Sequence, residues 1–175
     1  MSTLASSVDK TIRNVPDFPQ PGIQYKDITP VLANPDLMKG INAHFVAEYA
    51  DKNIDVIVGV ESRGFIFGVP LAMELGAAFV PVRKPGKLPA DVIKTEYTLE
   101  YGSGALEVHA DSIQPGQRVV IVDDLLATGG TLAASKKLVE ALGGDVVGCA
   151  VVINLTFLNG AEKLDGVPVE SLVNY

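Results

Sequence analysis

The stretch VVIVDDLLATGGT, residues 119–131, decides the fold. An apolar run, residues 119–122, leads directly into the paired acids Asp123 and Asp124, and a loop of small residues follows. The apolar run predicts a strand buried on both faces, and the loop predicts a turn into a helix. Ligands of open α/β sheets bind beyond the carboxyl ends of the strands, so this segment marks a candidate ligand site.

The chemistry of this loop indicates a phosphate with a sugar beside it. Backbone N–H groups in a Gly- and Thr-rich loop, followed by a helix N-terminus, suit a phosphate. Acids beside a phosphate alone are unfavourable, but Asp123 and Asp124 suit sugar hydroxyls or a cation, so the pattern favours a phosphorylated ribose. Neither a Walker A loop nor a GxGxxG motif is present. The alternative is a solvated acid pair before an ordinary strand-to-helix turn.

The rest of the chain alternates in the same way. Further apolar runs predict strands at Val56–Val60, Ala78–Val82 and 146–153, and helical spacing predicts helices at 35–49, 67–75 and 131–142. Strands that alternate with helices predict an α/β fold with a mainly parallel central sheet flanked by helices. Three regions do not fit: residues 15–30, the 22-residue insert 83–104, and the tail after Asn154. The insert is expected to be functional or mobile, and the tail to form a small accessory layer.

Composition limits the function classes. The chain has 175 residues, 47% of them hydrophobic, which suits one domain spanning 1–175. With 14 Lys and Arg against 21 Asp and Glu, the net charge of −7 argues against a nucleic-acid surface or an anionic membrane. No apolar stretch is long enough to span a membrane and no signal peptide is evident, so a cytoplasmic location is expected. The single cysteine, Cys149, excludes an internal disulfide and is expected in the core.

Four segments together resemble one enzyme family. The segment at 119–131 resembles the phosphoribosyl-pyrophosphate (PRPP) motif of type I phosphoribosyltransferases. Three further segments are similar to the family's adenine-specific branch: FPQPGIQYKDITP at 18–30, ESRGFIFGVPLA at 61–72, and RKPGKLP with TLEYG at 83–89 and 98–102. The resemblance covers residues 15–175. It implies the type I phosphoribosyltransferase fold, with a small hood from about 15–30 and the C-terminal tail, and a mobile lid at about 83–104.

The resemblance also implies a reaction. An adenine phosphoribosyltransferase transfers the 5-phosphoribosyl group of PRPP to N9 of adenine and gives AMP and pyrophosphate, a step of purine salvage. It implies Mg²⁺ bound mainly through PRPP, without a dedicated protein cage, and a homodimer. Two alternatives remain: transfer to another base, such as xanthine or hypoxanthine, and a PRPP-sensing regulator without catalysis. The acidic charge, the short segment before the first helix and the lid favour an enzyme.

The resemblance assigns roles to individual residues. Arg63 suits phosphate oxygens through its planar fork of donors, and Tyr25 suits stacking on a purine. Glu100 either stabilises the cationic ribose or accepts the N9 proton, and the Glu61–Ser62 peptide is expected in the cis form. The expected catalytic residues are Glu100, Arg63, Asp123, Asp124 and Tyr101; the 5′-phosphate residues are Ala127, Thr128, Gly129, Gly130 and Thr131; the ribose residues are Asp123 and Asp124; the pyrophosphate residues are Glu61, Ser62, Arg63, Arg83, Lys84 and Lys87; the adenine residues are Gln24, Tyr25, Lys26 and Leu126.

Overall fold

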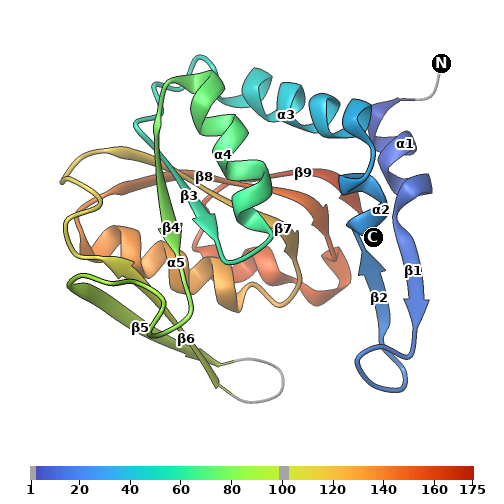
Figure 1. Cartoon of the computed structure of the whole chain (residues 1–175). Helices are drawn as coiled ribbons and strands as arrows, with labels where there is room; N and C mark the ends of the chain where they lie inside the picture. Colours follow the sequence, from blue (N-terminus) through green and yellow to red (C-terminus); the bar gives the residue numbers. More distant parts are fainter. Residues whose placement is uncertain (1–2, 99–102) are drawn as a thin grey trace. The chain divides into compact units, whose positions relative to one another are not determined.

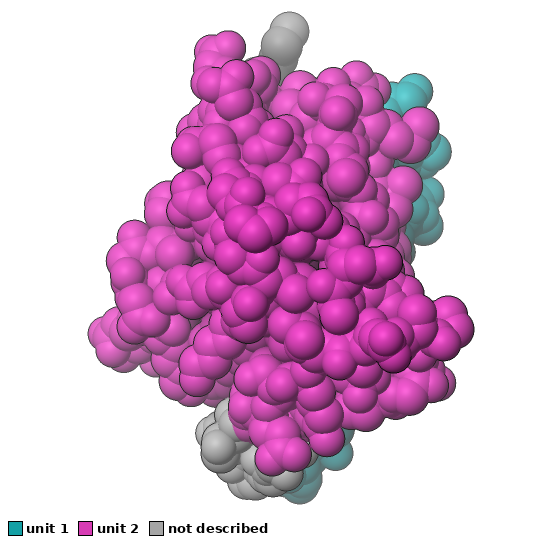
Figure 2. Space-filling view, turned by 90° about the vertical axis from the view of Figure 1, so that its left-hand side faces the viewer, with its two compact units in different colours: residues 1–44 teal, residues 45–175 magenta. Residues whose placement is uncertain are grey.

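The computed structural model of the chain describes residues 3–98 and 103–175. These residues form two units, 1–44 and 45–175, which Figure 2 shows in teal and magenta. Within the described residues, no helix combines the length and the apolar character needed to cross a membrane.

The first unit is built from short elements. They are α1 (Leu4–Thr11), β1 (Arg13–Pro16), β2 (Gln24–Asp27), α2 (Thr29–Leu32) and the start of α3 (Pro35–Tyr49). The segment 15–30, which did not fit the alternation, contributes to an antiparallel β1–β2 hairpin. The helix predicted at 35–49 is confirmed, and Asn34 caps it by accepting hydrogen bonds from the N–H groups of Asp36 and Leu37 at 3.1 and 3.2 Å.

The second unit holds the central sheet. Its elements are β3 (Val56–Val60), α4 (Gly64–Leu75), β4 (Ala78–Val82), β5 (Val92–Thr98), β6 (Ser103–His109), β7 (Arg118–Leu126), α5 (Gly130–Ala141), β8 (Asp145–Asn154), η1 (Thr156–Leu158), η2 (Gly160–Leu164) and β9 (Val169–Asn174). Five strands lie in the order β4-β3-β7-β8-β9, and every neighbouring pair is parallel. The predicted parallel sheet flanked by helices is therefore confirmed.

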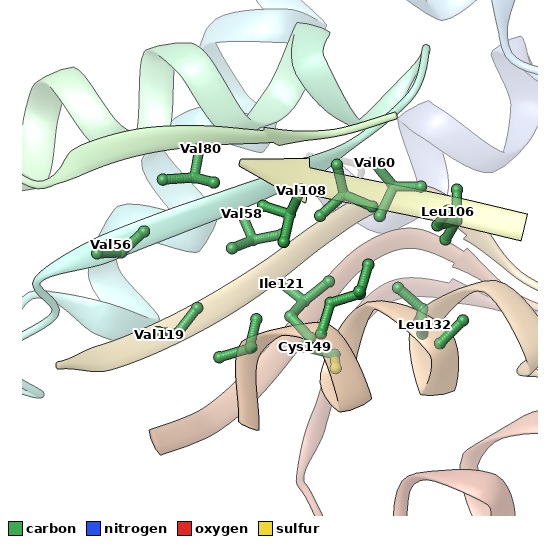
Figure 3. Close-up of a cluster of buried hydrophobic side chains, with 14 of the residues drawn as sticks. Val56, Val58, Val60, Val80, Leu106, Val108, Val119, Ile121, Leu132 and Cys149 are labelled. Carbon is green, nitrogen blue, oxygen red and sulfur yellow. The ribbon is translucent and has the colours of Figure 1, made fainter. Parts of the chain in front are cut away.

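The sheet buries both of its faces. Val56, Val58 and Val60 of β3 join a core cluster with Leu132 and other residues of α5, part of which is drawn in Figure 3. Ile57 points the other way, toward Gly68 of α4. The helices α4 and α5 accordingly lie on opposite faces of the sheet (Figure 1). This two-sided burial explains why the strand sequences are apolar without alternation. Cys149 is fully buried in this cluster, as predicted.

Two of the segments outside the alternation hold more regular structure than expected. The insert 83–104 contains β5, which pairs antiparallel with β6, because Ile93 and Tyr97 pack on the core while Lys94 and Glu96 between them are exposed. The alternation of buried and exposed residues on this strand is partly masked by the many charged residues of the insert. The tail was expected to form an accessory layer, but it supplies β9 to the main sheet. The predicted bounds of α4 and β7 were also too short.

Candidate active site

The candidate site lies where the direction of the sheet connections reverses. From β3 the chain passes through α4 to β4 on one side, and from β7 it passes through α5 to β8 on the other. The carboxyl ends of β3 and β7 lie side by side, because the two strands pair in parallel. Such a switch point leaves a crevice between two loops, and here the loops are residues 61–63 and 127–129.

A cavity of about 400 Å³ opens at this position. It brings together most of the residues that were predicted from four separate segments. The predicted residues in its lining are Glu61, Ser62, Arg63, Lys84, Asp123, Asp124, Leu126, Ala127, Thr128, Gly129, Gly130 and Thr131. Four further lining residues were not predicted: Tyr97, Leu106, Leu125 and Leu132. Of these four, Tyr97 could have been predicted to be partly buried, because it alternates with the exposed charged residues of β5.

The acid pair forms the most buried charged part of the cavity. Asp124 is 5% exposed, and Arg63 Nε donates a hydrogen bond to its Oδ2. The Asp124 N–H donates to Asp123 Oδ1 at 2.8 Å. Burial, and then the adjacent Asp124 charge, raise the pKa of Asp123 well above its usual range. The Arg63 guanidinium therefore lies against the buried Asp124 carboxylate.

The acid pair also offers oxygen atoms of the kind that bind Mg²⁺. Mg²⁺ is commonly held by one or two carboxylates together with substrate phosphate oxygens. Asp123 and Asp124 present such a donor set at the cavity. Among the described residues, no group of three or more His, Cys, Asp and Glu side chains is arranged to hold a metal ion. The two carboxylates thus fit part of the coordination of a Mg²⁺ ion.

The small-residue loop forms the start of α5. Gly129 has φ +78°, a left-handed conformation that glycine adopts readily, and α5 begins at the next residue. The first N–H groups of a helix have no partner inside the helix, and the helix dipole makes this end positive. Gly160 packs its backbone directly against the loop: a Cβ atom on it would lie 2.2 Å from the carbonyl oxygen of Ala127. The loop and the start of α5 thus have the features of an anion site, with the Gly160 backbone as one wall.

A turn that carries three cations lies next to Glu61. The Glu61 carboxylate accepts hydrogen bonds from the Lys84 N–H at 2.9 Å and from Arg83 Nε and Nη2 at 3.3 and 3.2 Å. Burial acts to raise the pKa of Glu61, but these hydrogen bonds and the Arg83 charge bring it below its usual value. Arg83 Nη1 also donates to the Lys87 carbonyl at 3.1 Å. Of the three cations, Lys84 lines the cavity. The expected cis peptide at Glu61–Ser62 is present.

The predicted adenine residues are divided between the units. Gln24, Tyr25 and Lys26 lie on β2 of the first unit, where the rings of Tyr25 and Phe18 form a T-shaped pair with centroids 5.1 Å apart. Lys26 Nζ donates to Asn14 Oδ1 at 2.7 Å. Leu126 is 1% exposed, belongs to the core cluster and contributes to the cavity wall. The remaining predicted residues, Glu100 and Tyr101, lie outside the described residues.

Known proteins resemble this chain over nearly its whole length. The phosphoribosyl transferase domain family matches residues 27–167. The adenine phosphoribosyltransferase of Clostridium perfringens is 56% identical over 169 residues, which are 97% of this chain and 98% of that protein. The solved structure of the Thermoanaerobacter pseudethanolicus adenine phosphoribosyltransferase is 51% identical with a TM-score of 0.95, and covers 99% of this chain and 100% of that one. The Saccharomyces cerevisiae enzyme, solved with an imino-altritol bisphosphate and adenine, is 41% identical with a TM-score of 0.91, over 98% of this chain and 99% of that one. With these similarities, the chain belongs to the phosphoribosyltransferase family and, within it, to the adenine phosphoribosyltransferases.

Proposed function

We propose that this protein transfers the 5-phosphoribosyl group of PRPP to N9 of adenine, releasing AMP and pyrophosphate. The observation that carries the proposal is the single cavity that joins the helix-start loop, the acid pair and Arg63. These groups match the parts of PRPP, which has a phosphate at one end, a diol in the middle and a pyrophosphate at the other end. The bisphosphate and adenine in the Saccharomyces cerevisiae structure support the same pair of substrates.

In this proposal, each part of PRPP has its own residues. The N–H groups at the start of α5 bind the 5′-phosphate, together with the hydroxyls of Thr128 and Thr131. Asp123 and Asp124 accept hydrogen bonds from the ribose hydroxyls. Arg63, placed beside Asp124, lies between the ribose and the pyrophosphate, which Lys84 also reaches from the turn held by Glu61.

The bond that breaks joins ribose C1 to the pyrophosphate oxygen, and the bond that forms joins C1 to N9 of adenine. The electron pair leaves with pyrophosphate, and positive charge builds on the ribose in the transition state. When bound, Mg²⁺ neutralises charge on the pyrophosphate and makes it a better leaving group. Asp123 and Asp124 are proposed to stabilise the developing cation. The N9 proton passes to an acceptor such as Glu100.

Gln24, Tyr25 and Lys26 are proposed to bind adenine. Tyr25 offers a ring for stacking, and such stacking is worth about 1–3 kcal/mol per base. A 6-amino purine needs an acceptor at N6 and a donor at N1, and backbone groups on a strand supply both. A 6-oxo purine needs a donor at O6 and, because its N1 carries a hydrogen, an acceptor at N1, so the two classes of base differ at both contacts.

Base competition tests the proposal directly. The protein is incubated with PRPP, Mg²⁺ and one base at a time: adenine, hypoxanthine, guanine or xanthine. Formation of AMP from adenine, with the other bases at least about 100-fold slower, is the expected result, because a site built for one hydrogen-bond pattern leaves polar groups unpaired with another. Faster turnover of a 6-oxo purine would refute the assignment of adenine. PRPP binding without turnover of any base would favour a regulator.

We further propose that the protein is a homodimer. Ile66, Val69 and Met73 lie on one face of α4, at helical spacing, and are 39%, 39% and 77% exposed. An exposed apolar stripe of this kind is typical of a protein interface. Light scattering is expected to give twice the chain mass of 18.4 kDa. The Met73→Asp variant is expected to shift this mass toward the monomer, and a monomeric wild-type protein would refute the proposal.

A further inference from the structure

The segment RKPGK, residues 83–87, forms a turn that we call the basic turn. Its central residues are Pro85 and Gly86, and Gly86 has φ +76°. A proline followed by a glycine with positive φ matches a type II turn, which needs both residue types at these positions. Lys84, which directly precedes Pro85 in this turn, lines the cavity. The conformation of the basic turn therefore determines where one of the cations of the site lies.

Glu107 holds the basic turn by three hydrogen bonds. It lies on β6 and is 9% exposed, which is unusual for a carboxylate. Its backbone pairs with Arg83 in both directions: the Arg83 N–H donates to the Glu107 carbonyl at 2.9 Å, and the Glu107 N–H donates to the Arg83 carbonyl at 2.7 Å. Its side-chain Oε2 accepts from the Gly86 N–H at 2.9 Å. One residue thus fixes both the start of the turn and its tightest point.

Glu61 holds the same turn from another side. Its carboxylate accepts from the Lys84 N–H at 2.9 Å. The backbone of the turn is therefore held by two carboxylates, one at Lys84 and one at Gly86. Glu107 directs its Oε2 to a backbone N–H, so that hydrogen bond fixes the turn without involving a lysine ammonium.

We propose that Glu107 is a positioning residue for the pyrophosphate subsite. It does not contact substrate; it fixes the basic turn, so that Lys84 and Lys87 are held ready for the pyrophosphate group of PRPP. The identity of the ligand rests on the proposed function. The contact that matters is the hydrogen bond from Gly86, so the reach of the side chain is needed and its charge is secondary. The 5′-phosphate subsite, which is built from α5, does not depend on Glu107.

Direct binding measurements distinguish an effect of Glu107 on the pyrophosphate subsite from an effect on the 5′-phosphate subsite. Inorganic pyrophosphate and AMP are each titrated calorimetrically, with Mg²⁺, into the wild type and into Glu107→Ala, Glu107→Asp and Glu107→Gln. The Ala and Asp variants lose the hydrogen bond from Gly86, so pyrophosphate is expected to bind about tenfold more weakly, while AMP binding changes less than about twofold. The Gln variant keeps an oxygen acceptor at the same reach, so its pyrophosphate affinity is expected to stay within about threefold of wild type. Glu96→Ala, at an exposed acid on β5, is the control and is expected to leave both affinities unchanged.

The affinities of the Glu107 variants for pyrophosphate and AMP either support or refute the positioning role of Glu107. Pyrophosphate affinity that is unchanged in folded Asp and Ala variants, or that falls together with AMP affinity, would overturn the proposal. If the Ala variant does not fold by circular dichroism, the contrast between Asp and Gln decides in the same way. A wild-type protein that makes no AMP from adenine and PRPP would refute the proposed function, but a selective loss of pyrophosphate binding would still support this role of Glu107.

Discussion

Gly160 offers the sharpest test of the phosphate loop, because it touches that loop without belonging to it. A Cβ atom on Gly160 would lie 2.2 Å from the Ala127 carbonyl oxygen and 2.8 Å from the Gly129 nitrogen. Both neighbours are backbone atoms, so no side-chain rotation relieves the clash. Gly160 does not have a positive φ, and a Gly160→Ala substitution therefore acts through this contact and not through backbone strain.

The size of the effect follows from the distances. An ordinary carbon–oxygen contact is longer than 2.2 Å by about 1 Å, so either η2 or the loop moves by about that much. Hydrogen bonds from N–H groups to phosphate oxygens span only about 2.7–3.2 Å, and a shift of about 1 Å breaks them. Each hydrogen bond to a charged group is worth about 1.5–3 kcal/mol. Loss of one such bond predicts that kcat/KM for PRPP falls by about 10- to 100-fold.

The assay is initial-rate formation of AMP at varied PRPP concentration and saturating adenine. Most of the loss is expected in KM for PRPP, because the 5′-phosphate is bound in both the ground state and the transition state. The neighbouring Ala161→Ser variant, at an exposed position, is the control and is expected to match wild type. A folded Gly160→Ala variant with kcat/KM within about twofold of wild type would refute the assignment of this loop to the 5′-phosphate.

Three other predictions follow from the charged and reactive groups. The pKa of Glu61 is lowered from 4.5 on folding, so its ionised form stabilises the protein above that pH, and this stabilisation is lost as the pH falls through the lower folded value. The difference in Tm between wild type and Glu61→Gln should therefore shrink on acidification. A difference that stays constant with pH would argue against the ion pair with Arg83. Burial raises the pKa of the Cys149 thiol to about 12, so a thiol reagent at neutral pH should label the protein only after unfolding, and rapid labelling of the native state would contradict its buried position. Glu100→Ala is expected to slow turnover by about 10²–10³-fold while PRPP still binds, and unchanged turnover in a rapid-quench assay would remove Glu100 from the mechanism.

The sheet and the phosphate loop were predictable because their signals are local. Two strands, Val56–Val60 and Ala78–Val82, were predicted with the bounds that the structure has. Burial on both faces leaves a continuous apolar run, and the left-handed residue before α5 is Gly129, a residue type that adopts this conformation readily. The pairing of Arg63 with Asp124 spans 61 residues and gives no comparable local signal. Arg63 and Asp124 were each predicted to be site residues. The periodicity of a sequence indicates which residues are buried, but it does not indicate which side chains contact one another.

Glu61 shows how a contact that the sequence does not reveal bears on the role proposed for a residue. The resemblance placed Glu61 with Arg63, Lys84 and the other pyrophosphate residues, but a carboxylate that faced a pyrophosphate directly would repel it. In the structure its oxygens accept hydrogen bonds from Arg83 and from the Lys84 backbone. An acid in this position partly offsets the Arg83 charge while it orders the turn that carries Lys84. Together with Glu107, which lies outside the cavity lining, it holds the backbone of the turn. We propose that the polyanion itself is bound by the lysines, by Arg63 and by the start of α5.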